Sequence, residues 1–112
     1  MIVGLGVDVV AVARIRTAMK SPRFLPRILT PQEIALELTP ERVAGRWAAK
    51  EALSKALPGL RNWQDIEVLN GPSGEPFVSF PGGFVLEPGL NLWVSISHER
   101  GYAAAVAVVE KP

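Results

Sequence analysis

The first ten residues alternate between two kinds of position, which predicts a β-strand over Ile2–Val10. The odd-numbered positions from 3 to 9 are all aliphatic, whereas Gly4, Gly6 and Asp8 occupy even-numbered positions. Successive side chains of a strand point to opposite faces. The pattern therefore predicts one apolar face and one face on which Asp8 has open space beside its carboxylate. Asp8 is then either a cap for the following helix or part of a functional site.

A second pattern, with a helical period, predicts a central helix. Thr39, Pro40 and Glu41 form a typical helix start, and Pro58-Gly59 forms a stop. A rotation of about 100° per residue places small residues on one stripe of this helix. The stripe contains Gly45, Ala49, Ala52 and Ala56, with Ala48 and Leu53 at its edges. So small a surface predicts close packing against another backbone, most simply a sheet.

Charged residues flank the small-residue stripe on both sides. Glu51 and Lys55 are four residues apart and project side by side on one flank, while Arg46 and Lys50 occupy the other. Glu51 and Lys55 are either an ordinary solvent-exposed pair or part of a site whose remaining members lie elsewhere in the chain.

Turn and capping signals predict short helices between the first strand and the central helix. A helix from Ala11 to about Lys20 is broken at Ser21-Pro22, and a short helical piece follows over Phe24–Leu29. The segment Thr30-Pro31-Gln32-Glu33 has the pattern of a capping box, which predicts the start of a helix that runs to about Glu37.

The second half of the chain predicts two β-hairpins. The first joins Ile66–Leu69 to Pro76–Phe80, and the second joins Leu92–Ser97 to Tyr102–Val109 through residues 98–101. Alternation along the third of these strands places His98 at its tip on the apolar side, where it is either a structural residue or a ligand. The expected fold is α+β, with an antiparallel sheet packed on the central helix.

Length and composition indicate a single domain over residues 1–112. The chain is 48% hydrophobic with a mean hydropathy of +0.21, which is high for so short a soluble chain and predicts burial of apolar surface between subunits. No apolar run approaches the roughly 20 residues that span a bilayer, and no signal-peptide pattern begins the chain. We therefore expect a cytoplasmic protein with no membrane partner.

The residue types narrow the possible chemistry. The absence of cysteine excludes disulfides and thiol chemistry, and a single histidine argues against a zinc site of the usual ligand set. Any metal would have to be a hard cation bound by oxygen. Asp8 and Glu51 are two such oxygen donors, with Lys55 one turn beyond Glu51. This combination suits Mg²⁺ completed by substrate phosphates, although no Walker or kinase motif accompanies it.

The net charge is only +1, but its distribution is uneven. Residues 9–32 contain five basic side chains and no acidic one: Arg14, Arg16, Lys20, Arg23 and Arg27. This basic segment has Phe24 as its single aromatic residue, whereas single-stranded nucleic acid is usually bound by several stacking rings. An acidic protein partner fits at least as well.

Four segments, taken together, resemble a known family. They are Gly4-Leu5-Gly6-Val7-Asp8 with Arg14-Ile15, Phe24 with Arg27-Ile28-Leu29-Thr30, the run from Gly45 to Ala56, and Val94-Ser95-Ile96-Ser97-His98 with Tyr102 to Val106. They are similar to holo-acyl-carrier-protein synthase, the small homotrimeric class of 4′-phosphopantetheinyl transferase. The resemblance spans nearly the whole chain and implies the fold of that family and a homotrimer.

The resemblance implies a reaction and a set of site residues. The family moves 4′-phosphopantetheine from coenzyme A to a serine of apo acyl carrier protein, with Mg²⁺, in fatty acid biosynthesis, and releases adenosine 3′,5′-bisphosphate. Asp8 and Glu51 match its metal ligands, and Lys55 completes the catalytic set. The implied coenzyme A contacts are Arg46, Ser54, Lys55, Pro76, Ser97 and His98. Each cleft of the family lies between two subunits.

The basic segment acquires a specific partner from the same resemblance. Acyl carrier proteins are acidic, and the first helix of the family receives them. The implied docking residues are Arg14, Arg16, Arg23 and Arg27, of which Arg14 lies within a matching motif. We expect such charges to tune association rate and salt dependence. No nucleic-acid partner is then expected.

The chain departs from the family at two places. The connection from Glu33 to Arg46 is shorter than usual, and Leu57-Pro58-Gly59-Leu60 stands where relatives have a Gly-Thr-Gly loop. Two other hypotheses remain open on the residues alone. One is a non-catalytic module whose basic helix binds an acidic protein or RNA, and the other is a trimeric structural domain without a ligand.

Overall fold

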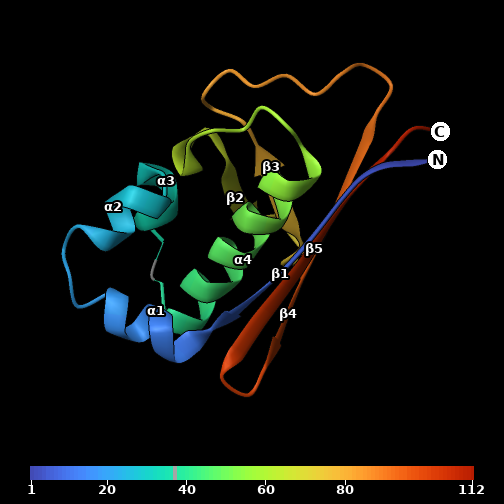
Figure 1. Ribbon diagram of the computed structural model, residues 1–112. Coiled ribbons are helices and arrows are strands. Elements are labelled where there is room, and N and C mark those ends of the chain that lie inside the picture. Colours follow the sequence, from blue (N-terminus) through green and yellow to red (C-terminus); the bar gives the residue numbers. More distant parts are fainter. Residues whose placement is uncertain (37) are drawn as a thin grey trace.

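The protein consists of a three-stranded antiparallel sheet with one long helix packed across one face (Figure 1). The computed structural model describes residues 1–36 and 38–112. The sheet contains β1 (Ile2–Ala11), β4 (Asn91–Glu99) and β5 (Tyr102–Glu110) in the order β1-β5-β4, and the long helix is α4 (Pro40–Ala56). The predicted α+β fold, with an antiparallel sheet on a central helix, is confirmed.

Helix α4 begins and ends where the local sequence predicts. The Thr39 hydroxyl accepts a hydrogen bond from the Arg42 backbone N–H at 3.2 Å, and a proline follows as the first helical residue. The helix ends at Ala56, and three residues later Gly59 has a φ of 104°. Residues with a Cβ rarely adopt this conformation. Pro58-Gly59 therefore turns the chain away from the helix axis.

Two glycines allow β1 to approach α4 closely. A Cβ built at Gly4 would overlap the carbonyl oxygen of Ala56, and one built at Gly6 would overlap that of Ala52. Along the small-residue stripe, Ala49 and Ala52 are fully buried against the sheet. The predicted packing of this stripe on the first strand is confirmed, and it fixes the distance between the two elements that carry Asp8 and Glu51.

Three short helices lie beside α4: α1 (Val12–Ala18), α2 (Phe24–Ile28) and α3 (Pro31–Ile34) (Figure 1). The predicted capping box is present before α3. Helix α3 is shorter than predicted because the chain must soon turn to begin α4, and Glu37, the expected end, lies outside the described residues. In the part of the chain that the structure describes, no helix is long and apolar enough to cross a membrane.

Both predicted hairpins are present. Strands β2 (Glu67–Asn70) and β3 (Pro76–Ser79) pair in a separate two-stranded sheet, preceded by the 3₁₀ turn η1 (Trp63–Asp65). In the second hairpin β4 and β5 continue pairing up to Glu99 and Tyr102, so its turn is tighter than expected from residues 98–101. The extended pairing carries His98 within β4, on the face toward α4.

The face of the sheet that points away from α4 is apolar and exposed. On β1 the side chains of Val3, Leu5, Val7 and Val9 are each between 51% and 63% exposed, and Trp93 on β4 is 59% exposed. The four β1 residues occupy the odd-numbered positions that were predicted to form one apolar face. A continuous apolar surface of this kind marks an interaction site in a soluble protein.

Candidate functional site

The predicted catalytic residues meet between β1 and α4. The Lys55 ammonium contacts Asp8 Oδ1 at 3.2 Å and donates a hydrogen bond to the Val7 carbonyl oxygen at 2.9 Å. Asp8 is mostly buried, with its side chain 18% exposed, whereas that of Lys55 is 51% exposed. We call Asp8, Glu51 and Lys55 the carboxylate cluster. The structure therefore brings together the three residues that the sequence predicts.

Asp8 is not a helix cap in this structure. Helix α1 has Ala11 at its N-cap position, and no side chain caps it. The capping alternative for Asp8 is therefore wrong, and its carboxylate faces α4 instead. Because Asp8 and Val10 point to the same face of β1, the open space beside two glycines becomes the place where Lys55 and Glu51 approach.

The charge environment of Glu51 ties it to Asp8. Burial raises the pKa of Glu51, and repulsion from the Asp8 carboxylate raises it further, while the positive charges of Lys55 and Arg14 oppose the shift. Two carboxylates that repel each other in this way are suited to act as oxygen ligands for a cation. Glu51 and Lys55 are thus more than an ordinary surface pair, because Lys55 also contacts Asp8, which lies 47 residues away in the chain.

Next to this cluster lies an apolar groove between α1, α2 and α4. It has a volume of about 550 Å³, and its walls include Arg14, Phe24 and Trp47. Trp47 also packs edge-on against Trp63, with ring centroids 4.5 Å apart. Since Arg14 lines the groove and also influences the pKa of Glu51, the groove opens beside the carboxylate cluster.

The other predicted docking residues lie around this groove in different roles. Arg16 points away and forms an exposed ion pair with Glu41 at 2.9 Å. Arg23 and Arg27 are exposed at the two ends of α2. Only Arg14 of the predicted docking residues is among the residues that line the groove in the described structure. The basic segment therefore forms an exposed surface, and Arg14 is its arginine nearest the groove.

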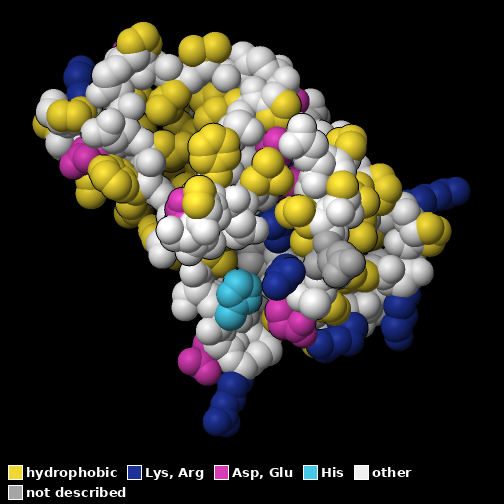
Figure 2. Space-filling model, turned by 180° about the vertical axis from the view of Figure 1, so that it is seen from behind, with side chains coloured by type: hydrophobic (Ala, Val, Ile, Leu, Met, Phe, Trp, Pro, Cys, Tyr) yellow, Lys and Arg dark blue, Asp and Glu magenta, His cyan; other side chains and the backbone are white. Residues whose placement is uncertain are grey.

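A second groove, the basic groove, lies on the other side of α4. It has a volume of about 560 Å³ and contains three of the predicted coenzyme A contacts, Arg46, Pro76 and His98. In Figure 2 the single histidine of the chain, in cyan, lies beside dark blue Lys and Arg side chains on this side of the molecule. Its remaining lining residues are Arg42, Gly45, Val68, Asn70, Gly74 and Ile96.

Arg46 is held rigidly at the base of this groove. Its Nε donates to the Val68 carbonyl oxygen at 3.0 Å, and its Nη2 donates to Asn70 Oδ1 at 2.7 Å. Burial lowers the pKa of Arg46, with repulsion from Arg42 in the same direction and attraction to Glu33 against it. His98 Nε2 lies 3.1 Å from the Glu41 carbonyl oxygen. Two guanidinium groups and an imidazole in one hollow suit a phosphate.

Two predicted coenzyme A contacts lie outside the basic groove. Ser97 is exposed on the opposite face of β4 from His98, because alternate strand residues point to opposite faces. Ser54 donates a hydrogen bond to the Glu51 carbonyl oxygen at 2.8 Å and borders a separate small cavity near Trp63. In the described part of the chain, neither serine is among the residues that line the basic groove.

The carboxylate cluster and the basic groove lie on opposite flanks of α4. Lys55 reaches the edge strand β1, whereas Gly45 packs against His98 on the other edge strand, β4. Strand β5 separates these two edges. The body of the helix therefore stands between the two parts of the predicted site within one chain.

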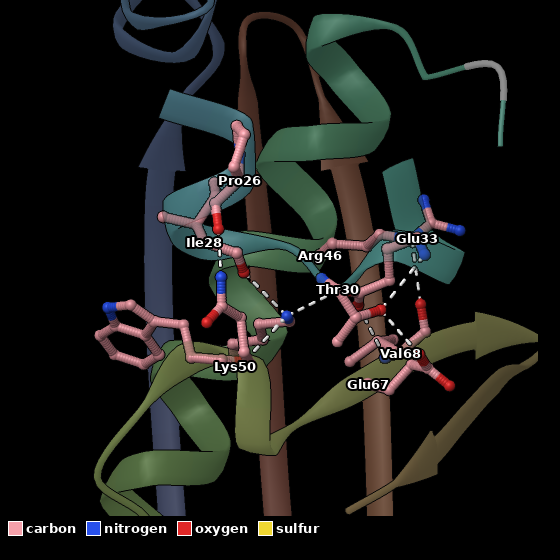
Figure 3. Close-up of polar contacts among 10 residues, drawn as sticks. Pro26, Ile28, Thr30, Glu33, Arg46, Lys50, Glu67 and Val68 are labelled. Atoms are coloured by element: carbon pink, nitrogen blue, oxygen red, sulfur yellow. Dashed lines mark hydrogen bonds and ion pairs between the residues drawn. The ribbon is translucent and has the colours of Figure 1, made fainter. Parts of the chain in front are cut away.

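A buried polar network on the basic-groove side was not predicted from the sequence (Figure 3). Its centre is Lys50, whose side chain is fully buried and forms an ion pair with Glu33 at 2.6 Å. Helical spacing indicated only that Lys50 lies beside Arg46. The capping box identified Thr30 and Glu33 as local partners, but no sequence signal connects them to a lysine 17 residues further on.

Comparisons with known proteins identify the family of this chain. A family model described as the 4′-phosphopantetheinyl transferase superfamily matches residues 4–107. The holo-[acyl-carrier-protein] synthase of Beutenbergia cavernae is 44% identical over 118 residues, covering 99% of this chain and 100% of that protein.

Solved structures match over the same extent. The holo-(acyl-carrier-protein) synthase of Bacillus anthracis in complex with CoA (3′,5′-ADP) has a TM-score of 0.81 and 35% identity, covering 100% of this chain and 99% of that chain. The Helicobacter pylori holo-[acyl-carrier-protein] synthase in complex with coenzyme A has a TM-score of 0.82 and 33% identity, covering 95% and 99%.

The fold and these matches define the class of protein as a transferase. The chain belongs to the 4′-phosphopantetheinyl transferase superfamily, and within it to the holo-[acyl-carrier-protein] synthases. The family resemblance predicted from the four sequence segments is confirmed.

Proposed function

We propose that this protein transfers 4′-phosphopantetheine from coenzyme A to a serine of apo acyl carrier protein, with Mg²⁺ held by Asp8 and Glu51. Its relatives are named as holo-[acyl-carrier-protein] synthases, and two of the solved relatives contain coenzyme A or part of it. Within this chain, the observation that carries the proposal is the meeting of Asp8, Glu51 and Lys55 on two adjacent elements. The second product is adenosine 3′,5′-bisphosphate, and the carrier serves fatty acid biosynthesis.

The donor set fits Mg²⁺ better than a metal that needs a complete protein cage. Among the residues that the structure describes, no group of three or more His, Cys, Asp or Glu side chains could hold a metal. Asp8 and Glu51 therefore offer two hard oxygen ligands, and Mg²⁺ is commonly bound through one or two carboxylates together with substrate phosphates. When bound, the cation would neutralise the pyrophosphate and favour in-line displacement at phosphorus.

Glu51 and Lys55 of the carboxylate cluster have separate roles in the transfer. The serine oxygen forms a bond to the β-phosphorus while the bond from that phosphorus to the nucleotide oxygen breaks, and the electron pair leaves with adenosine 3′,5′-bisphosphate. Glu51 accepts the serine proton, directly or through a water molecule. Lys55 places positive charge beside the leaving group, where charge develops during the reaction.

The basic groove receives the nucleotide end of coenzyme A in this proposal. Arg46 and His98 bind the 3′-phosphate, and Pro76 borders the adenine. Ser54 and Ser97 are assigned to the coenzyme A site by the family resemblance and lie outside this groove in the chain. The carrier docks on the basic segment with Arg14 nearest the chemistry. The cytoplasmic location stays a prediction.

A homotrimer accounts for two features of the single chain. The exposed apolar face of β1 would be buried between subunits. The basic groove of one subunit would then face the carboxylate cluster of its neighbour, so that one coenzyme A molecule contacts both. A site shared in this way resolves the separation of the two parts on opposite flanks of α4.

The proposal is tested by replacing Glu51 with glutamine. Purified protein, apo acyl carrier protein, coenzyme A and Mg²⁺ are incubated, and mass spectrometry follows the gain of one phosphopantetheine group by the carrier. We expect the Glu51→Gln variant to lose at least about 100-fold in turnover, because a cation ligand and proton acceptor are removed together.

Glu87→Gln provides the matched control, since Glu87 lies in the exposed segment between β3 and β4. This variant should transfer the group at the wild-type rate. Turnover of Glu51→Gln within a few-fold of wild type would reduce Glu51 to a surface partner. Absence of transfer by the folded wild-type protein, with a verified carrier, would contradict the proposed function.

A further inference from the structure

We propose that Glu33 and Lys50 are positioning residues that hold Arg46 in the basic groove through the backbone of Val68. The inference rests on the proposed function, because it assigns the nucleotide end of coenzyme A to that groove. It concerns residues that touch neither substrate nor cation, and it places the control of coenzyme A binding in the interior of the protein (Figure 3).

The Lys50–Glu33 pair is completely enclosed and fully hydrogen-bonded. Both side chains have no exposed surface, and the Lys50 ammonium lies 2.6 Å from Glu33 Oε1. Its other two hydrogen bonds go to the carbonyl oxygens of Ile28 at 2.8 Å and Trp63 at 3.0 Å. Burial lowers the pKa of Lys50, and the Glu33 carboxylate opposes this shift. One ammonium group therefore joins α2, α3, α4 and η1.

The Glu33 carboxylate carries the connection onward to β2. Its Oε1 accepts the Thr30 backbone N–H at 2.7 Å, and its Oε2 accepts the Val68 N–H at 2.8 Å. The Thr30 hydroxyl donates to Glu67 Oε2 at 2.6 Å. Two consecutive residues of β2 are thus anchored to α3 and its N-cap residue. Figure 3 shows these contacts converging between α4 and the strand.

Val68 is the link between the buried pair and the groove. Its N–H is bound by Glu33, while its carbonyl oxygen accepts the Nε–H of Arg46 at 3.0 Å. Two residues further along the same strand, Asn70 Oδ1 accepts from Arg46 Nη2 at 2.7 Å. The position of β2 therefore sets the position and orientation of the guanidinium group.

Glu33 also stabilises Arg46 through its negative charge, in addition to positioning it through Val68. Arg46 is buried, with 6% of its surface exposed, and Arg42 repels it within the same groove. The Glu33 carboxylate attracts Arg46 and so offsets that repulsion in the chain without a ligand. A buried ion pair is weak evidence for stability alone, since apolar residues often replace such pairs without loss. This pair, however, also binds Val68, which in turn binds Arg46.

The arrangement predicts an effect confined to one substrate. Lys50 and Glu51 are neighbours in sequence but lie on opposite flanks of α4, and Lys50 points toward η1 rather than toward Asp8. Loss of the pair should weaken binding at the basic groove. It should leave the carrier surface around Arg14 and the chemistry at the carboxylate cluster unchanged.

The test compares Glu33→Gln, Lys50→Met and the double variant that carries both changes. Single variants leave a buried charge without its partner and should lower the unfolding temperature, while the double variant regains much of it because no lone charge remains. We expect the double variant to bind adenosine 3′,5′-bisphosphate about tenfold more weakly, with a similar rise in KM for coenzyme A. Its kcat and its KM for the carrier should stay within about twofold of wild type.

The controls separate this inference from the proposed function. Glu87→Gln combined with Lys111→Met changes the same residue types at exposed positions and should behave as wild type. A double variant that regains stability together with wild-type nucleotide affinity would overturn the positioning role. Wild-type protein that neither binds the nucleotide nor transfers the group would instead contradict the proposed function.

A second experiment uses the wild-type protein and so does not depend on the folding of any variant. Adenosine 3′,5′-bisphosphate is added to the wild-type protein, and hydrogen exchange of backbone amides is followed by NMR. The N–H groups of Thr30 and Val68, both donors to Glu33, should exchange more slowly when Arg46 is held by phosphate. Unchanged exchange at both amides, while the Arg46 signals shift, would contradict the connection.

Discussion

Glu51 occupies an environment that works against its own ionisation. Its carboxyl is partly buried and lies near the negative charge of Asp8. The positive charges of Lys55 and Arg14 partly offset both effects. Such an arrangement costs folding free energy in the free protein and becomes favourable when a cation arrives. At the scale of single residues, the candidate site is thus a place where stability is given up for binding.

This cost predicts a pH-dependent effect of Glu51→Gln on stability. The ordinary pKa of the group is 4.5, and the fold raises it. At lower pH the carboxyl is protonated in both folded and unfolded states, so the cost is absent. It develops as the pH rises above the ordinary pKa, where the unfolded state ionises first, and is complete above the folded pKa. Without added metal, Glu51→Gln should melt about 1–2 °C higher than wild type at pH 7, since Glu51 is partly exposed.

Thermal unfolding by circular dichroism, with a chelator present, measures this difference. The gain should shrink toward zero as the pH falls to 4. A gain that grows on acidification would mean that the carboxylate is stabilised by the fold, and would contradict the direction of the pKa shift.

At the scale of elements, the contact between β1 and α4 sets the geometry of the site. The glycines of β1 leave room for the helix backbone, and the small-residue stripe of α4 fills that room. Close-packed backbones transmit small displacements, because protein interiors have few voids. A displacement of the strand would move Asp8 directly away from Glu51.

Gly6→Ala tests this contact. The added Cβ would overlap the Ala52 carbonyl oxygen, which is backbone and cannot rotate away. We expect a loss of about 1–3 kcal/mol in the free energy of unfolding, measured with urea, together with weaker Mg²⁺-dependent activity. Asn91→Ala, at an exposed strand end, should change the free energy of unfolding by less than about 0.5 kcal/mol. Equal stability of Gly6→Ala and wild type would show that β1 has freedom to shift.

At the scale of the whole molecule, one chain is an incomplete enzyme under the proposed function. Its carboxylate cluster lies at the β1 edge, its basic groove lies at the β4 edge, and its apolar sheet face is open. A closed ring of three subunits would cover that face and repeat the same contact three times. Each coenzyme A molecule would then be bound by two neighbouring chains.

Mixed trimers test the shared site. Asp8→Asn removes a cation ligand, and His98→Glu places negative charge where the 3′-phosphate is proposed to bind. Each variant alone should be inactive. If the two are unfolded together and refolded in equal amounts, about one quarter of the sites would combine an intact cluster with an intact groove. Carrier modification should recover to that fraction of the wild-type rate, with the trimer confirmed by light scattering. Mixing without any recovery would place each site within one chain.

Much of this protein was determined by local sequence. Strand alternation assigned Asp8 and His98 to the correct faces, and Thr39 with Pro58-Gly59 bounded α4 within a residue or two. Small residues predicted the closest packing contact. These features depend on neighbours within a few positions, so periodicity and capping preferences are enough to reveal them. Glu51 and Lys55 followed from helix spacing together with the family resemblance.

Tertiary structure alone decided which distant groups meet. It turned Lys55 toward Asp8 and buried Lys50 with Glu33. It also put the two parts of the proposed site on opposite flanks of α4. The physical reason is that such pairs depend on how whole elements pack, and a shift of one residue in a strand reverses the direction of every side chain. The local sequence around a lysine on a helix flank does not show whether its ammonium group is exposed to water or binds a buried carboxylate.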